Sequence, residues 1–292
     1  ARRVPLVPRP PMSSEASKTP PQESTNVDAA DRALTPAMRQ YREFKKKYPQ
    51  YVLFFRMGDF YEMFWEDAHL AARVLGVALT ARSKGDDAIP MAGVPFHAVE
   101  GYLRKMIAAG HKVAICEQTE DASAAKGLVK RDVVRLLTPG TLTDEPFLDA
   151  NAENHLAAVA LHLTSDGFRC GLAWVDLSTG RFTAFSGTEG AVLDEMDRLR
   201  PAEVLVPELP SGQPHDIAGR IESMGIRSVT PRPGWQFTPH HAAEEVARQW
   251  GARGAAGFGF ADDDPGLLAA AAILSYLQET QRTACGHLRP LS

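Results

Sequence analysis

Several features common in other protein classes are missing from this chain of 292 residues. Its cysteines, Cys116, Cys170 and Cys285, are widely spaced and form no CxxC pair, which argues against a disulfide scaffold or a zinc site. No apolar run approaches the roughly 20 residues that a membrane-spanning helix needs, and no apolar leader segment is visible. With 44% hydrophobic and 23% charged residues, the composition is typical of a globular protein, for which we expect a cytoplasmic location and no membrane contact.

The weak net charge of −4 is unevenly distributed. Residues 34–150 contain 16 basic and 15 acidic residues, whereas residues 151–292 contain 11 basic and 17 acidic residues. Every lysine lies at or before Lys130. A weakly acidic chain has no strong nucleic-acid signature, so we expect any DNA contact in the first folded region and any protein contact in the second.

Residues 1–33 are rich in Pro, Ser, Thr and charge and have few large apolar side chains, which predicts a disordered N-terminal tail. From residue 35 the apolar spacing predicts an α/β domain with a mixed or parallel sheet. The predicted helices cover residues 35–48, 59–75 and 99–109. The predicted strands cover residues 51–57, 77–80, 112–117 and 133–138, and the prolines of 89–95 predict a rigid turn.

A second pattern starts near residue 151. Residues 155–163, 170–176 and 181–186 predict a three-stranded antiparallel meander, with turns at 165–167 and 178–180. After it we expect helices at 191–199, 217–224, 240–250 and 267–283 and a strand at 203–206. The long alanine-rich last helix is suited to packing on a sheet.

The most informative stretch is 54–64, in which an apolar strand ends at Gly58-Asp59 and is followed by Phe60 and Glu62. An aromatic residue and a carboxylate two positions apart could push a ring into a base stack and test the edge of a base. A structural interpretation competes, because Asp59 and Glu62 also fit the D-x-x-E capping box of a helix. In that helix Phe60 and Phe64 would pack as an i, i+4 pair. The two interpretations differ in the exposure of Phe60.

Six segments in order resemble the N-terminal part of the MutS family of DNA mismatch-recognition proteins. They are 56–62 (RMGDFYE), 89–98 (IPMAGVPFHA), 113–118 (VAICEQ), 134–141 (VRLLTPGT), 176–182 (DLSTGRF) and 280–283 (TQRT). After the disordered tail expected at 1–33, the resemblance implies a mismatch-binding domain at 34–145 and an RNase H-like connector domain at 151–275. It also implies that 276–292 begin a helical lever domain.

The resemblance further implies that Phe60 and Glu62 bind the mispaired base in double-stranded DNA. Arg82 and Lys84, on a polar loop, could neutralise phosphates of the DNA backbone. In the full-length family the resemblance implies ATP and Mg²⁺, a homodimer, and a MutL-type partner bound through the connector.

The 292 residues contain no G-x-x-x-x-G-K-[ST] phosphate loop. We therefore expect a piece of a longer protein, with no catalytic residue, metal or cofactor of its own.

Two other functions remain open from the residues. Asp176, followed by Ser178-Thr179-Gly180, could serve a metal-dependent RNase H-like or actin-like enzyme, although such chemistry needs further carboxylates. A hairpin turn is the structural alternative for that segment. The acidic second half could instead be a docking module for a partner, without DNA specificity of its own.

Overall fold

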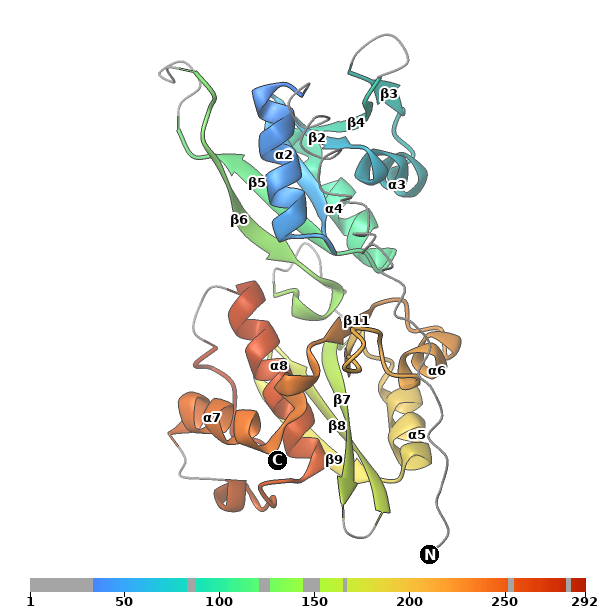
Figure 1. Ribbon diagram of the computed structural model, residues 1–292, viewed down its shortest axis with the longest axis vertical. Helices are drawn as coiled ribbons and strands as arrows, with labels where there is room; N and C mark the ends of the chain where they lie inside the picture. Colours follow the sequence, from blue (N-terminus) through green and yellow to red (C-terminus); the bar gives the residue numbers. More distant parts are fainter. Residues whose placement is uncertain are drawn as a thin grey trace, which may run out of the picture. The chain divides into compact units, whose positions relative to one another are not determined.

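A computed structural model describes residues 34–82, 88–120, 127–143, 153–164, 167–251, 255–281 and 285–292. The predicted tail at 1–33 lies outside these ranges. The chain divides into two compact units after residue 40, so helix α2 (Pro36–Lys47) begins in the first unit and ends in the second. Figure 1 shows that the second unit contains two sheets, each with helices on both faces.

The first sheet has six strands in the order β3-β4-β2-β1-β5-β6. Strands β1 and β5 are parallel, and the other neighbours are antiparallel, so the sheet is mixed. The strand bounds are β1 (Val52–Met57), β2 (Phe60–Phe64), β3 (Thr80–Ala81), β4 (Pro90–Pro95), β5 (Val113–Gln118) and β6 (Arg131–Leu137).

Helices cover both faces of this sheet. On one face, α3 (Glu66–Leu75) and α4 (Val99–Ala108) bury their apolar side chains against Phe54, Tyr61 and Met63. On the other face, Tyr41 of α2 lies edge-on to Phe55 and Phe64, with ring centroids 5.5 and 5.1 Å apart. The mixed α/β class predicted from the sequence is confirmed.

Three predicted elements of this region differ from the structure. The helix predicted at 59–75 begins only at Glu66, because 60–64 form strand β2 between β1 and β4. The turn predicted at 89–95 is strand β4, in which both prolines occupy terminal positions where their missing N–H groups are tolerated. The strand predicted at 77–80 is shorter and lies later in the chain, because β3 contains only Thr80 and Ala81.

The second sheet has five strands in the order β11-β10-β7-β8-β9. Strands β7 (His155–Thr164), β8 (Gly167–Asp176) and β9 (Arg181–Gly187) form the predicted antiparallel meander. Strands β10 (Glu203–Pro207) and β11 (Val229–Arg232) extend the sheet in parallel on the other side of β7. This arrangement confirms the expected RNase H-like fold. Strand β11 was not predicted.

Helices α5 (Glu189–Leu199) and α6 (Ile217–Ser223) pack on one face of the second sheet. Helices α7 (Pro239–Trp250) and α8 (Pro265–Gln281) pack on the other, with the apolar α8 directly against the strands. The predicted boundary at residue 275 lies inside α8. Residues 285–292 return to β9, where the Ala184 N–H donates to the Ser292 carbonyl. Among the described helices, none is both long and apolar enough to cross a membrane.

Candidate nucleic-acid interface

Strands β1 and β2 form a tight hairpin around Gly58 and Asp59. Gly58 has φ +58°, a left-handed conformation that glycine adopts without a steric penalty. The register pairs Met57 with Phe60 and Phe55 with Glu62. The Asp59 carbonyl accepts a hydrogen bond from the N–H of Phe96, at 2.9 Å, so the turn is also fastened to the end of β4. Phe60 is therefore the first residue of β2, and the turn that precedes it is held in place by the pairing of β1 with β2 and by this hydrogen bond.

Side chains of β2 alternate between the two faces of the sheet. Tyr61 and Met63 point into the core, while Phe60, Glu62 and Phe64 share the opposite face. Along that face the exposure falls from 47% at Phe60 to 1% at Phe64. Because Phe60 begins a strand and is exposed, both the capping box at Asp59 and the helical packing of Phe60 on Phe64 are excluded.

Glu62 is half-buried and paired with a cation. Nη1 of Arg82 lies 2.9 Å from Oε2 of Glu62, and the Glu62 side chain is 19% exposed. Burial raises the pKa of Glu62, and the positive charges of Arg82 and Arg131 oppose that rise. The carboxyl group is therefore closer to taking up a proton than an exposed glutamate, and it could accept or donate a hydrogen bond.

Sequence reasoning missed a second exposed aromatic residue, Phe96, and two arginines, Arg56 in strand β1 of the hairpin and Arg131 in β6. The guanidinium carbon of Arg56 lies 3.7 Å from the ring centroid of Phe96, which is 43% exposed. Arg131 donates from Nε to the Arg56 carbonyl at 2.9 Å and lies over the Phe55 ring. Arg56 and Phe96 belong to the motifs at 56–62 and 89–98 and could have been found there. Arg131 is 75 residues from Arg56 and needed the strand order.

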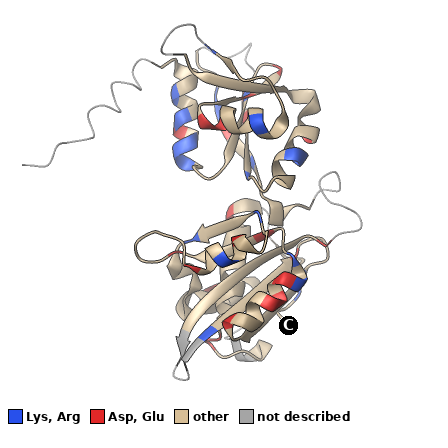
Figure 2. Cartoon of the chain, turned by 90° about the vertical axis from the view of Figure 1, so that its right-hand side faces the viewer, with Lys and Arg blue, Asp and Glu red and all other residues tan. Residues whose placement is uncertain are grey.

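Arg82 and Lys84 are the two residues for which the sequence predicts phosphate contacts. Arg82 follows β3 and is engaged with Glu62 rather than standing alone. Lys84 lies outside the described residues. We call residues 34–150 the first region and residues 151–292 the second region. Figure 2 shows several basic residues of the first region along α2. Within that helix, Nζ of Lys45 lies 2.7 Å from Asp67 and 2.6 Å from the Tyr51 carbonyl oxygen.

Asp176 in the second region makes a turn rather than a metal site. Its carboxylate accepts hydrogen bonds from the backbone and hydroxyl of Ser178 and from the hydroxyl of Thr179, all within 2.9 Å. Burial alone would raise the pKa of Asp176, but these hydrogen bonds outweigh it and lower that pKa. Gly180 closes the turn at φ +69°. No group of three or more metal-ligating side chains occurs in the ranges that the structure describes.

The cavity beside Asp176 also does not suit a metal. It has a volume of about 470 Å³, and Arg181, Arg198 and Arg289 line it together with Asp176 and Glu153. The arginines outnumber the carboxylates, so a divalent cation would meet net repulsion. The enzyme hypothesis therefore has no supporting geometry among these residues.

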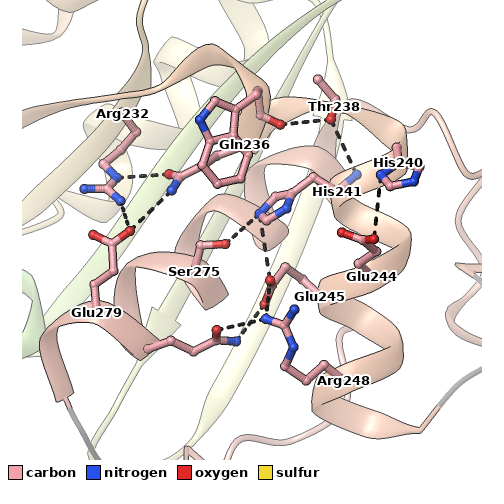
Figure 3. A network of polar contacts seen from close by, with 12 residues as sticks. Arg232, Gln236, Thr238, His240, His241, Glu244, Glu245, Arg248, Ser275 and Glu279 are labelled. Carbon is pink, nitrogen blue, oxygen red and sulfur yellow. Dashed lines mark hydrogen bonds and ion pairs between the residues drawn. The ribbon is translucent and has the colours of Figure 1, made fainter.

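A second polar network joins α7 to α8 (Figure 3). Nε2 of His241 lies 2.6 Å from Oγ of Ser275 and 3.9 Å from Glu245, so both partners meet the same ring nitrogen. A nucleophile, base and orienting acid would instead use the two nitrogens separately. Ser275 is 7% exposed within α8, and the network fastens two helices. The side chain of His241 is buried, whereas that of its neighbour His240 is exposed.

Comparisons with known proteins agree with this architecture. The family model of MutS domain I matches residues 35–146, and that of MutS domain II matches residues 154–289. The DNA mismatch repair protein MutS of Pelotomaculum thermopropionicum is 42% identical over 255 residues. These residues are 86% of this chain and 29% of that protein, so the chain spans less than a third of the relative's length.

Proposed function

We propose that this chain, which belongs to the MutS family, recognises mispaired or unpaired bases in double-stranded DNA, with Phe60 as the wedge and Glu62 as the group that contacts the base. The observation that carries the proposal is the exposed ring of Phe60 at the start of β2, two residues from a half-buried carboxylate. The 42% identity to a DNA mismatch repair protein supports mismatch repair as the process.

The mechanism follows from the mechanics of DNA. A side chain inserted from the minor groove breaks one stacking step at a cost of a few kcal/mol and kinks the duplex. A mismatched step has already lost part of its pairing, so the same insertion costs less there. A phenyl ring can stack on any base, which allows one residue to detect many mispairs. Arg56, in strand β1 of the hairpin, supplies positive charge toward phosphates.

Glu62 adds a test of the base edge. An ionised carboxylate is repelled by phosphates, which disfavours binding where no base contact compensates. Beside DNA the phosphates and the low dielectric would raise the pKa of Glu62 further, in the same direction as burial in the free protein. A protonated Glu62 could donate to a ring nitrogen, and an ionised one could accept from a base N–H.

The test uses a chimera in which this chain replaces the corresponding residues of the P. thermopropionicum relative. Binding to a duplex with one G·T mispair is compared with binding to the matched homoduplex. We expect the chimera to prefer the heteroduplex and Phe60→Ala to lose that preference, while Phe185→Ala, an exposed aromatic of the second region, retains it. Equal binding of the two duplexes by the unmutated chimera would contradict the proposal.

The other family properties belong to longer proteins and are proposals for this one. We propose that ATP and Mg²⁺ act outside these residues, because the sequence contains no phosphate loop. A homodimer and a MutL-type partner, bound through the second region, complete the proposed assembly. The chain alone would then act as a binding module and not as an enzyme.

A further inference from the structure

Arg82 reaches Glu62 from a separate strand. Its backbone N–H donates to the Ile89 carbonyl at 3.0 Å, immediately after β3 pairs with β4. From this fixed point the side chain extends along the sheet, with its guanidinium 5.7 Å from the ring of Phe64, and ends 2.9 Å from Glu62. The contact thus crosses from the edge of the sheet to the strand that carries Phe60.

The pair is placed where DNA could compete for it. The Arg82 side chain is 34% exposed and that of Glu62 is 19% exposed, so the ion pair is neither buried nor fully hydrated. A partly exposed ion pair of this kind contributes little to stability, so a nearby phosphate could compete with it. Arg131 is the other positive charge that acts on Glu62, and its own guanidinium is held by the Arg56 carbonyl.

We propose that Arg82 is a positioning residue for mismatch recognition, which acts by directing and neutralising Glu62 rather than as an independent phosphate contact. This inference rests on the proposed function of Glu62. While the pair is intact, the Glu62 carboxylate is held toward Arg82, and the positive charge of Arg82 opposes the rise in the pKa of Glu62. Without Arg82 the carboxylate gains rotamer freedom that DNA binding must then remove, and it takes up a proton more readily.

A double-mutant cycle in the chimera tests the inference. Arg82→Gln, Glu62→Gln and the double variant are compared by the ratio of affinities for the G·T heteroduplex and the homoduplex. We expect Arg82→Gln to lower this ratio by roughly two- to fivefold when Glu62 is present, and to leave it unchanged in the Glu62→Gln background. Arg73→Gln, which removes an exposed positive charge from α3, serves as the matched control and should leave the ratio unchanged.

A pH profile separates positioning from a structural effect. Loss of Arg82 should move the pH dependence of heteroduplex binding to higher pH, and this shift should vanish in the double variant. Equal effects of Arg82→Gln in both Glu62 backgrounds would overturn the inference and leave Arg82 as a phosphate contact. If the unmutated chimera failed to discriminate at all, the proposed function itself would fail, so the two failures are distinguishable.

Discussion

The two regions of this protein share a mixed α/β class but place their polar groups differently. In the first region Phe60 and Phe96 are exposed, Arg56 lies over the ring of Phe96, and Glu62 forms an ion pair with Arg82. In the second region the carboxylates of Asp176 and Glu203 are enclosed by hydrogen bonds. Glu203 is fully buried and accepts hydrogen bonds from the hydroxyls of Thr230 and Tyr276. The comparison teaches that the candidate site is marked by a partly exposed carboxylate, Glu62, close to an exposed aromatic ring. The number of charged residues does not mark it.

Two phenylalanines on one face of β2 give the largest expected difference in stability. Phe64→Ala removes a ring that is 1% exposed and packed on Tyr41, and we expect a loss of about 3–5 kcal/mol. Phe60→Ala should change the free energy of unfolding by about 0.5 kcal/mol or less, because its ring is already half in water. Urea unfolding followed by circular dichroism measures both. A comparable loss at both positions would contradict the assignment of Phe60 to the surface.

Replacement of Asp176 is expected to give the second-largest loss of stability. It tests whether this carboxylate of the second region has a structural role. Asp176→Asn should cost about 1–3 kcal/mol, since Ser178 and Thr179 would lose a charged acceptor. Because the pKa of Asp176 is lowered in the folded protein, its contribution is present above the ordinary aspartate value of about 3.9 and is lost as the pH falls through the lower folded value.

Unfolding free energies of Asp176→Asn between pH 3 and 7 therefore should depend less on pH than those of the unmutated protein. Asp194→Asn, at an exposed position of α5, is the control and should keep the full dependence. Unchanged stability of Asp176→Asn at pH 7 would argue that the carboxylate serves something other than the turn.

The smallest expected effect concerns His241 between α7 and α8. Burial lowers the pKa of His241, and Glu245 and Glu244 partly oppose this. The folded protein therefore favours the neutral ring, and its stability should fall as the pH drops below about 6.5, the ordinary value. We expect the loss to stay below about 1 kcal/mol. Thermal unfolding at pH 7.5 and 5.5 checks this, with His241→Gln removing the dependence and the exposed His240→Gln retaining it.

Much of the fold could be predicted because its patterns are local. The meander and helix α8 have clear periodicity and turn residues, and both are confirmed. Strand β2 could not be predicted as easily, because Asp59 and Glu62 imitate a helix start and only pairing with β1 and β4 selects the strand. Its period of two, with Tyr61 and Met63 inside, was the available signal. Strand β11 was hidden by Pro231, which an edge strand tolerates.

The candidate site could be predicted only where its residues are close together in the sequence. Phe60 and Glu62 are neighbours in sequence, and their motif identified them. The ion pair of Arg82 with Glu62 joins residues 20 positions apart and depends on the register of β3 against β4, which no local pattern specifies. The sequence therefore indicated which residues to consider, and the sheet determined which of them meet.

The alternation along β2 sets a limit on how this surface could change. Since odd-numbered Tyr61 and Met63 fill the interior, a shift of one residue between β1 and β2 would turn Phe60 and Glu62 inward and bring two core side chains out. Insertions or deletions of a single residue at Gly58-Asp59 are thus incompatible with the packing of the core and with the exposure of Phe60. This surface can change only by replacement of side chains on an unchanged hairpin, because a shift of register would bury it.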